Sequence, residues 1–343
     1  MITEGSVKLD IDVKGVVNKK LPVFYNPVMK LNRDTSVEIL NKYFGVPPRV
    51  ALPLSGSGIR GMRFLKECKV KEVHFNDYSD GFVDAMEKRL ELNSIDSSNV
   101  FISNKDANIF LLGSKGFDYI DVDPFGTPNP FLDAAVQRIS RNGILAVTAT
   151  DTSALAGTYP SVCLRNYDAV PLRNWLKHVV GIRILIRKIQ LIGAQYEKAL
   201  TPVLCYSKDH YYRVFLKCEK SKEKSTAIVK SHLYLDYDAD SLEYSFSKHS
   251  GKNSFGKMYS GELWDKKYST TLVKFLDDEI RTEGHYIDIH AFCKKKELAV
   301  PNYTVLEERL KSSGYSFSRS HFSLLMIRTT ASSVALEKII HGI

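Results

Sequence analysis

A repeated strand–helix pattern between residues 49 and 149 constrains the fold more than any other feature of this chain. Apolar segments with the length of buried strands occur at 49–54, 72–77, 100–103, 117–122 and 143–149. Helical stretches, of which 81–93 and 130–139 are the clearest, lie between them. Strands that alternate with helices pair in parallel, because each crossover returns the chain to the same edge of the sheet. The sequence therefore predicts an α/β fold with a doubly wound parallel sheet.

A glycine-rich loop follows the first predicted strand. Gly56, Gly58 and Gly61 form a G-x-G-x-x-G motif, which lets a nucleotide approach the backbone near a helix N-terminus. Asp77 ends the second strand, where an acid can hold ribose hydroxyls. Asp106-Ala107 follows the third strand, where a carboxylate can accept a hydrogen bond from an adenine amino group. Together these features predict either a nicotinamide dinucleotide or S-adenosylmethionine as the cofactor.

The fourth strand ends in Asp123-Pro124-Phe125-Gly126. Proline cannot continue a strand ladder, so Pro124 stops the strand. The carboxylate of Asp123 and the ring of Phe125 are left at a carboxyl end, where open α/β sheets bind ligands. A carboxylate accepts hydrogen bonds from an amine, and a ring stacks on a flat base. A dehydrogenase has no need of this motif, whereas a methyltransferase acting on a nucleobase amine does, so we favour S-adenosylmethionine.

The net charge of +9 is concentrated in one segment. Residues 160–221 contain 11 Lys and Arg against 4 Asp and Glu. A solvated face usually mixes the two signs, so this excess favours a phosphate-binding surface over a chance basic helix. The candidate phosphate contacts are Arg165, Arg173, Lys177, Arg183, Arg187 and Lys188.

Length and cysteine usage predict the general class of protein. A chain of 343 residues is long enough for two domains that each bury a core. No apolar run is long enough to span a bilayer, and the N-terminus lacks a secretory segment. The five cysteines are scattered without a C-x-x-C pair, which is typical of reduced thiols and gives no zinc site. We expect a cytoplasmic protein with no membrane association and no metal.

A charged connector at 217–224 sets the predicted domain boundary, between a domain at 1–221 and a domain at 222–343. The C-terminal part is rich in tyrosine and in both charges. Predicted helices at 271–281 and 302–312 and a predicted strand at 322–329 indicate a smaller α+β domain. This domain either grips nucleic acid, with Lys294, Lys295 and Lys296 on phosphates, or only braces the first domain.

The segment 24–34 is unusual for a linker because it holds two aromatics, a proline and charged residues. Either it packs as an N-terminal extension, or it folds Phe24 and Arg33 over the active site as a cover. Asp34-Thr35-Ser36 has the composition of a cap for a helix through Val37 and Tyr43.

Four blocks of the sequence together resemble the tRNA (guanine-26) N2-dimethyltransferase family. They are 24–34, 56–64, 123–130 and 149–168, and the clearest match extends over 123–134. The resemblance covers residues 20–217 and continues toward the end of the chain. Within the family, the chain is similar to a compact archaeal-type member. It implies a Rossmann-like class I methyltransferase fold, S-adenosylmethionine as methyl donor, and tRNA as substrate without an obligate protein partner, so we expect a monomer.

The resemblance also implies roles for individual residues. Asp123 is the expected catalytic carboxylate, with Phe24 and Phe125 flanking the guanine and the Pro124 carbonyl accepting the second N–H. The expected donor contacts are Arg33, Arg63, Asp77, Asp106 and Ala107, beside the loop glycines Gly56 and Gly58. Many relatives carry four clustered cysteines early in the C-terminal domain. This chain has none at 234–246, so we predict no structural zinc.

Two other interpretations stay open at this point. An N6-adenine methyltransferase acting on DNA or RNA also needs a carboxylate beside an exocyclic amine. A non-catalytic RNA-binding protein with an inactive nucleotide fold would keep the basic segment but would have no need of Asp123.

Overall fold

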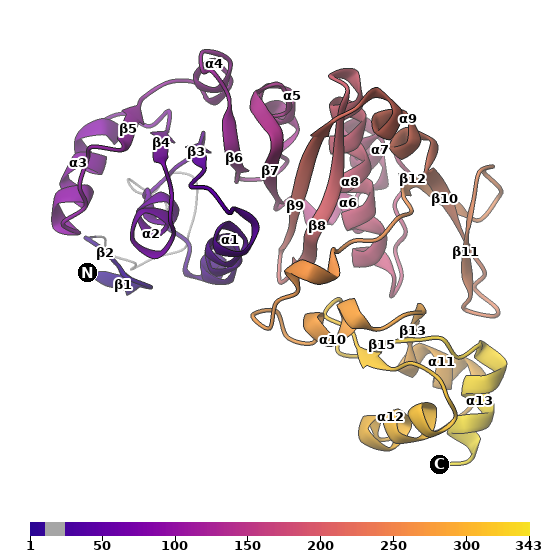
Figure 1. The fold of residues 1–343 in the computed structure, drawn as a ribbon. Coiled ribbons are helices and arrows are strands. Elements are labelled where there is room, and N and C mark those ends of the chain that lie inside the picture. Colours follow the sequence, from indigo (N-terminus) through magenta and orange to yellow (C-terminus); the bar gives the residue numbers. More distant parts are fainter. Residues whose placement is uncertain (11–24) are drawn as a thin grey trace. The chain divides into compact units, whose positions relative to one another are not determined.

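The computed structural model describes residues 1–10 and 25–343, and within these ranges the chain forms two compact units (Figure 1). Unit 1 comprises residues 1–151, 189–203 and 213–226, and unit 2 comprises residues 152–188, 204–212 and 227–343. The units therefore interleave along the chain. From the sequence we predicted one boundary between two domains, at residues 221 and 222, and that division stays a prediction.

A mostly parallel seven-stranded sheet has the order β5-β4-β3-β6-β7-β9-β8, and its strands β3 to β7 lie entirely in unit 1. The chain runs from β3 outward through β4 to β5, then returns to β3 and runs the other way through β6 and β7. The doubly wound parallel sheet that the sequence predicted is thus confirmed. The direction of winding reverses between β3 and β6, and in open α/β sheets ligands bind at such a switch point. The strands are β3 (Arg49–Leu52), β4 (Glu72–Asn76), β5 (Val100–Ser103), β6 (Phe117–Val122), β7 (Ile139–Ala149), β8 (Lys198–Lys208) and β9 (Tyr211–Lys220).

Helices connect these strands close to the predicted positions. They are α1 (Lys30–Tyr43), α2 (Ile59–Glu67), α3 (Phe82–Leu92), α4 (Ala107–Leu112) and α5 (Asn129–Arg138). Helix α2 packs directly on β4, and α5 packs on β6 and β7. Close approach of α2 requires Gly61, because a Cβ there would lie 2.2 Å from Cε1 of Phe75 and 2.6 Å from Cδ1 of Leu52. The third glycine of the motif therefore serves helix–sheet packing.

The predicted cap of α1 is wrong. The helix begins at Lys30, so Asp34, Thr35 and Ser36 lie inside it. The Thr35 and Ser36 hydroxyls donate back to the carbonyl of Asn32, at 3.0 and 2.8 Å. A short helix, η1 (Pro27–Met29), immediately precedes α1 and starts the turn earlier than the sequence indicated.

A two-stranded hairpin, β1 (Ile2–Glu4) and β2 (Val7–Leu9), precedes this region and was not predicted. Strand β2 packs against α2 and α3, and the buried side chains of Val7 and Leu9 anchor it. The hairpin brings Glu4 to the N-terminal half of α1.

Unit 2 contains two antiparallel three-stranded sheets, in the orders β11-β10-β12 and β13-β15-β14. A separate apolar core joins the second sheet to the last helices through Phe292, Leu306, Leu310, Ile327 and Leu336, among others. The predicted α+β character of the C-terminal part is confirmed. The strands are β10 (His232–Tyr237), β11 (Tyr244–Ser247), β12 (Ser254–Tyr259), β13 (His285–Asp288), β14 (Ser318–Arg319) and β15 (Met326–Thr329).

Helices of both units complete the description. They are α6 (Thr152–Leu155), α7 (Pro160–Tyr167), α8 (Lys177–Gln195), α9 (Lys222–Lys230), η2 (Lys266–Tyr268), α10 (Leu276–Arg281), α11 (Ile289–Lys296), α12 (Tyr303–Ser312) and α13 (Ser333–His341). No helix in the two described ranges combines the length and the apolar character that crossing a membrane requires.

Candidate active site

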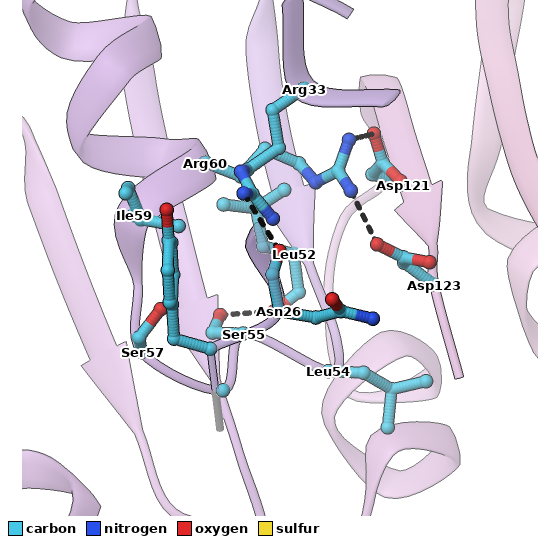
Figure 2. A pocket seen from close by; sticks show the side chains of 12 residues that line it. Asn26, Arg33, Leu52, Leu54, Ser55, Ser57, Ile59, Arg60, Asp121 and Asp123 are labelled. Atoms are coloured by element: carbon cyan, nitrogen blue, oxygen red, sulfur yellow. Dashed lines mark hydrogen bonds and ion pairs between the residues drawn. The ribbon is translucent and has the colours of Figure 1, made fainter. Parts of the chain in front are cut away.

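A pocket in unit 1 opens at the switch point between β3 and β6 (Figure 2). The loop after β3 forms one wall, the end of β6 forms another, and residues before and within α1 complete it. Loop and strand-end residues meet here because both follow the carboxyl ends of adjacent parallel strands. The lining residues are Tyr25, Asn26, Arg33, Leu52, Leu54, Ser55, Gly56, Ser57, Ile59, Arg60, Asp121 and Asp123.

Two carboxylates of β6 lie in this pocket, and two arginines neutralise them. Asp121 is fully buried and accepts from Arg213 through both oxygens, at 2.9 and 2.6 Å, and from the Tyr119 hydroxyl at 2.7 Å. Burial alone would raise the pKa of Asp121, but the charges of Arg213 and Arg60 outweigh it and hold that pKa below its ordinary value. Asp123, at the strand end, is about one-fifth exposed and pairs with Arg60.

The residues after Asp123 turn the chain away from the sheet. Gly126 has a positive φ of 83°, and its N–H donates to the Thr150 hydroxyl at 2.6 Å. That bond ties the turn to the residue that follows β7. The ring of Phe125 is 40% exposed, so part of its surface is available to a flat ligand.

The acids after β4 and β5 are held by the backbone. One Asp77 oxygen accepts from the Gly56 N–H at 2.7 Å, and the other accepts from Ser79. The glycine loop and the end of β4 are therefore joined. Asp106 caps α4 by accepting from the N–H groups of Asn108 and Ile109, and Ala107 is buried behind it. Of the predicted donor contacts, Gly56 and Arg33 line the pocket, whereas Asp77, Asp106, Ala107, Gly58 and Arg63 are not among its lining residues.

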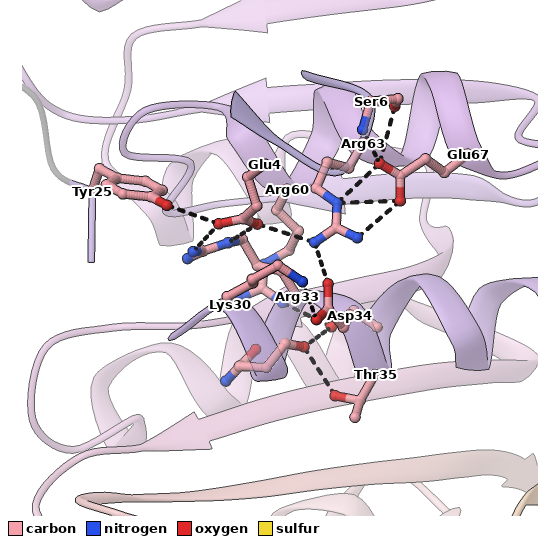
Figure 3. A network of polar contacts seen from close by, with 12 residues as sticks. Glu4, Ser6, Tyr25, Lys30, Arg33, Asp34, Thr35, Arg60, Arg63 and Glu67 are labelled. Atoms are coloured by element: carbon pink, nitrogen blue, oxygen red, sulfur yellow. Dashed lines mark hydrogen bonds and ion pairs between the residues drawn. The ribbon is translucent and has the colours of Figure 1, made fainter. Parts of the chain in front are cut away.

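Arg33 and Arg63 belong to a buried network that the sequence did not reveal (Figure 3). Glu4 accepts from Arg33 at 2.5 and 2.7 Å, from Arg63 at 3.0 Å and from the Tyr25 hydroxyl at 3.0 Å. Burial raises the pKa of Glu4, but the hydrogen bonds and charges of its partners, Arg33 first among them, outweigh burial. The pKa of Glu4 therefore lies below its ordinary value. Arg63 also pairs with Asp34 at 2.6 Å and with Glu67. Their predicted contacts with a donor stay predictions.

The six basic candidates of unit 2 fall into two groups. Arg165, Arg173 and Lys177 are exposed and Lys188 is half-buried. The guanidinium of Arg183 donates to the carbonyls of Tyr259 and Gly261, at 3.0 and 2.7 Å. Arg187 is 7% exposed and bonds to the end of α7, at the carbonyls of residues 167 and 168 and the Asp168 carboxylate. These two guanidinium groups are thus bonded to backbone carbonyls, and the predicted tRNA contacts of all six residues stay predictions.

Phe24 lies outside the described residues, so its predicted place beside the base stays a prediction. All five cysteines are free thiols. Within residues 1–10 and 25–343, no three His, Cys, Asp or Glu side chains gather as metal ligands. The expected absence of zinc also stays a prediction.

Sequence reasoning missed two functional neighbours of Asp123. Arg60 stands inside the glycine motif, where only the glycines were interpreted. Arg213, which pairs with Asp121, lies on β9, 92 residues further along the chain than Asp121. The i, i+2 spacing of Asp121 and Asp123 was a readable signal, since such residues share one face of a strand and two adjacent carboxylates need cations.

The sheet order, the glycine loop and the carboxylate at the switch point define a protein with a Rossmann-like methyltransferase fold. A solved structure supports this class over the whole chain. The complex of Trm1 from Pyrococcus horikoshii with S-adenosyl-L-methionine superposes with a TM-score of 0.90 at 32% identity, covering 99% of this chain and 99% of that one.

The chain belongs to the N2,N2-dimethylguanosine tRNA methyltransferase family, whose model matches residues 5–341. A tRNA (guanine(26)-N(2)/guanine(27)-N(2))-dimethyltransferase from Aquifex aeolicus is 40% identical over 291 residues, covering 79% of this chain and 74% of the relative. A tRNA (guanine(26)-N(2))-dimethyltransferase from Pyrococcus abyssi is 33% identical over 366 residues, covering 96% and 95%. The family that the sequence resembles is thus confirmed.

Proposed function

We propose that this protein transfers methyl groups from S-adenosylmethionine to the exocyclic N2 of guanine 26 in tRNA, giving N2-methyl- and N2,N2-dimethylguanosine. The observation that carries the proposal is Asp123, an acidic residue paired with Arg60 in a pocket at the switch point of the sheet. Family membership supplies the substrate class. A non-catalytic RNA-binding protein would have no need of such a carboxylate.

The loop after β3 is suited to hold the methyl donor. Gly56 has a φ of +54° and lines the pocket without a side chain, so a ligand can approach the backbone. Asp77 is fixed beside it by the 2.7 Å bond to the Gly56 N–H. Its carboxylate oxygens keep further lone pairs for ribose hydroxyls. S-adenosylmethionine, when bound, supplies an electrophilic methyl group, and we assign its binding to Arg33, Arg63, Asp77, Asp106 and Ala107, beside Gly56 and Gly58.

Asp123 orients the guanine amine. The N2 lone pair is delocalised into the ring, so N2 must be aimed and its developing positive charge offset. The carboxylate of Asp123 accepts one N–H, and the carbonyl of Pro124 accepts the other. Phe125 and Phe24 stack on the extruded base. Each such contact contributes about 1–3 kcal/mol, comparable to the few kcal/mol that extrusion costs.

The exposed cations of unit 2 bind the tRNA backbone. Arg165, Arg173 and Lys177 carry charge at the surface, and Lys and Arg that neutralise phosphates bind nucleic acid without regard to sequence. Lys188 adds to this set. Specificity for position 26 then comes from the fold of the tRNA and from the base pocket.

Nucleoside analysis of methylated tRNA tests the proposal. The purified protein is incubated with a tRNA transcript and methyl-labelled donor, and the digested nucleosides are separated. We expect N2-methyl- and N2,N2-dimethylguanosine. Labelled N6-methyladenosine would support the adenine alternative instead, and no labelled nucleoside would indicate a binding protein.

The relative from Aquifex aeolicus is named for guanine 27 as well as guanine 26. Mapping the modified nucleotide by primer extension separates the two positions, and we expect a block at 26. We further propose that the enzyme acts as a monomer in the cytoplasm. Light scattering after gel filtration checks the monomer.

A further inference from the structure

Arg60 lies between Asp121 of β6 and Asp123, which follows that strand, and it pairs with both (Figure 2). Its Nη1 donates to the Ser36 hydroxyl at 2.7 Å and to Asp121 Oδ2 at 3.3 Å. Its Nη2 donates to Oδ2 of Asp123. One nitrogen of the guanidinium is thus anchored in the core, and the other is presented to Asp123.

A second arginine, Arg213, holds the core partners of Arg60 in place. Arg213 is fully buried and donates to Ser36 at 2.8 Å and to both oxygens of Asp121. It also donates to the Thr148 hydroxyl at 3.0 Å. Helix α2, which carries Arg60, is pressed against the sheet at Gly61. Ser36 and Asp121, the two core partners of Arg60, are therefore each held from a second side by Arg213.

The two oxygens of Asp123 therefore have different tasks. Oδ2 accepts from Arg60, while Oδ1 has no recorded protein partner within residues 1–10 and 25–343. We propose that Arg60 is a positioning residue for methyl transfer, which holds the carboxyl group of Asp123 in place through Oδ2 and leaves Oδ1 for the guanine amine. This inference rests on the proposed function.

Of the arginines around Asp123, Arg60 is the one that pairs with it. The charged and titratable groups near it are Arg60 on α2, Asp121 and Tyr119 on β6, Arg213 on β9, and Arg33 on α1. Arg213 is committed to Asp121 and Arg33 to Glu4. Without Arg60, Asp123 would lie beside the carboxylate of Asp121 with no cation of its own.

The test compares Arg60→Met with Arg60→Lys in the full-length protein. Methyl transfer to tRNA is measured at saturating donor and tRNA, and donor affinity is measured by calorimetry. For Arg60→Met we expect kcat to fall about 100-fold, the size of one lost preorganised contact, with donor Kd within about threefold. Arg60→Lys keeps the charge, so part of the kcat should return.

A double variant separates positioning from folding. If Arg60 acts through Asp123, then Arg60→Met should have little further effect on kcat in an Asp123→Asn background. A structural role would lower kcat by the same factor in both backgrounds. Where Arg60→Met does not fold, Arg60→Lys takes its place in the cycle, with a smaller expected loss that again vanishes beside Asp123→Asn.

Two results would overturn the inference: an unchanged kcat in folded Arg60→Met, or equal losses of kcat in the two backgrounds. Failure of the wild-type protein to form dimethylguanosine would overturn the proposed function instead. The wild-type reaction is therefore run beside each variant, so the two failures are distinguishable.

Discussion

Asp123 is the single residue on which methyl transfer depends most directly. Replacing it with Asn removes the negative charge while nearly keeping the shape. We expect Asp123→Asn to lower the single-turnover rate at least about 100-fold, because the charge that develops on N2 is no longer offset. Donor affinity should remain measurable. Asp133→Asn, an exposed carboxylate on the following helix α5, is the matched control and should keep the wild-type rate. Near-normal turnover in Asp123→Asn would remove the catalytic assignment.

Glu4 is the residue that holds the arginines of the N-terminal network. Breaking a buried ion pair by removing one partner costs about 3–5 kcal/mol, because a buried charge is left unpaired. Glu4 is 2% exposed, so Glu4→Gln should lower the free energy of unfolding by about this amount in urea titrations. Glu38→Gln disrupts the more exposed Lys42 pair and should cost less than about 1 kcal/mol. Equal unfolding midpoints for the two variants would mean that the network does not stabilise the fold.

Single residues also show where sequence reasoning stops. Asp123 was recognised because proline and a strand end mark it locally. Arg183 and Arg187 were counted as surface cations, since a charge count cannot distinguish an exposed guanidinium from one bonded to backbone carbonyls. The hairpin that carries Glu4 makes its polar contacts with residues 33 and 63. The sequence of residues 1–10 does not indicate which distant residues they contact.

At the scale of elements, the packing of α2 on the sheet sets the position of the glycine loop. Gly61→Ala would place a methyl group within 2.2 Å of Phe75, so the helix or the ring must move. We expect a loss of about 1–3 kcal/mol in the free energy of unfolding. Gly45→Ala, where nothing lies within 4 Å of the added Cβ, should change the stability by less than about 0.5 kcal/mol. An equally small effect of both substitutions would contradict the close packing.

Strands β3 to β6 were predicted closely from the sequence. The ranges of β5 and β6 are those expected, because each strand is a short apolar run bounded by polar or turn residues. The start of α1 was misplaced since Asp34, Thr35 and Ser36 have the composition of a cap, yet the helix already begins at Lys30. Tertiary contacts use these side chains instead, as the pairing of Asp34 with Arg63 shows.

For the whole molecule, buried titratable groups predict a fall in stability with acid. Burial lowers the pKa of His178 and of His232 from 6.5 to about 4. The unfolded chain therefore binds protons that the folded protein excludes, so this contribution is complete above pH 6.5 and is lost as the pH falls toward 4. Glu4 and Asp121, whose pKa values are also lowered, add to the loss at more acidic pH.

Urea titrations at a series of pH values check this dependence. The unfolding midpoint should decrease steadily below about pH 6.5, and His232→Gln should flatten part of the decrease. A midpoint that stays constant from neutral pH to about pH 5 would contradict the assignment of neutral buried histidines.

Binding of tRNA is also a property of the whole molecule. Reversing the charges of Arg165, Arg173 and Lys177 to Glu should weaken binding and reduce the slope of log K against log salt by about 2–3, because each lost phosphate contact removes about 0.7–0.9. Lys115→Glu is the control, since this exposed lysine precedes β6, at the opposite end of that strand from Asp123. An unchanged slope in the triple variant would mean that these cations do not contact tRNA.

The central claim is that the enzyme methylates the exocyclic amine of guanine 26. A tRNA transcript with inosine at position 26 tests it most directly, because inosine keeps the purine ring and lacks only that amine. We predict up to two methyl groups on the guanine transcript and none on the inosine transcript, which should still compete for binding. Methyl incorporation into the inosine transcript at the rate seen with guanine would contradict the claim.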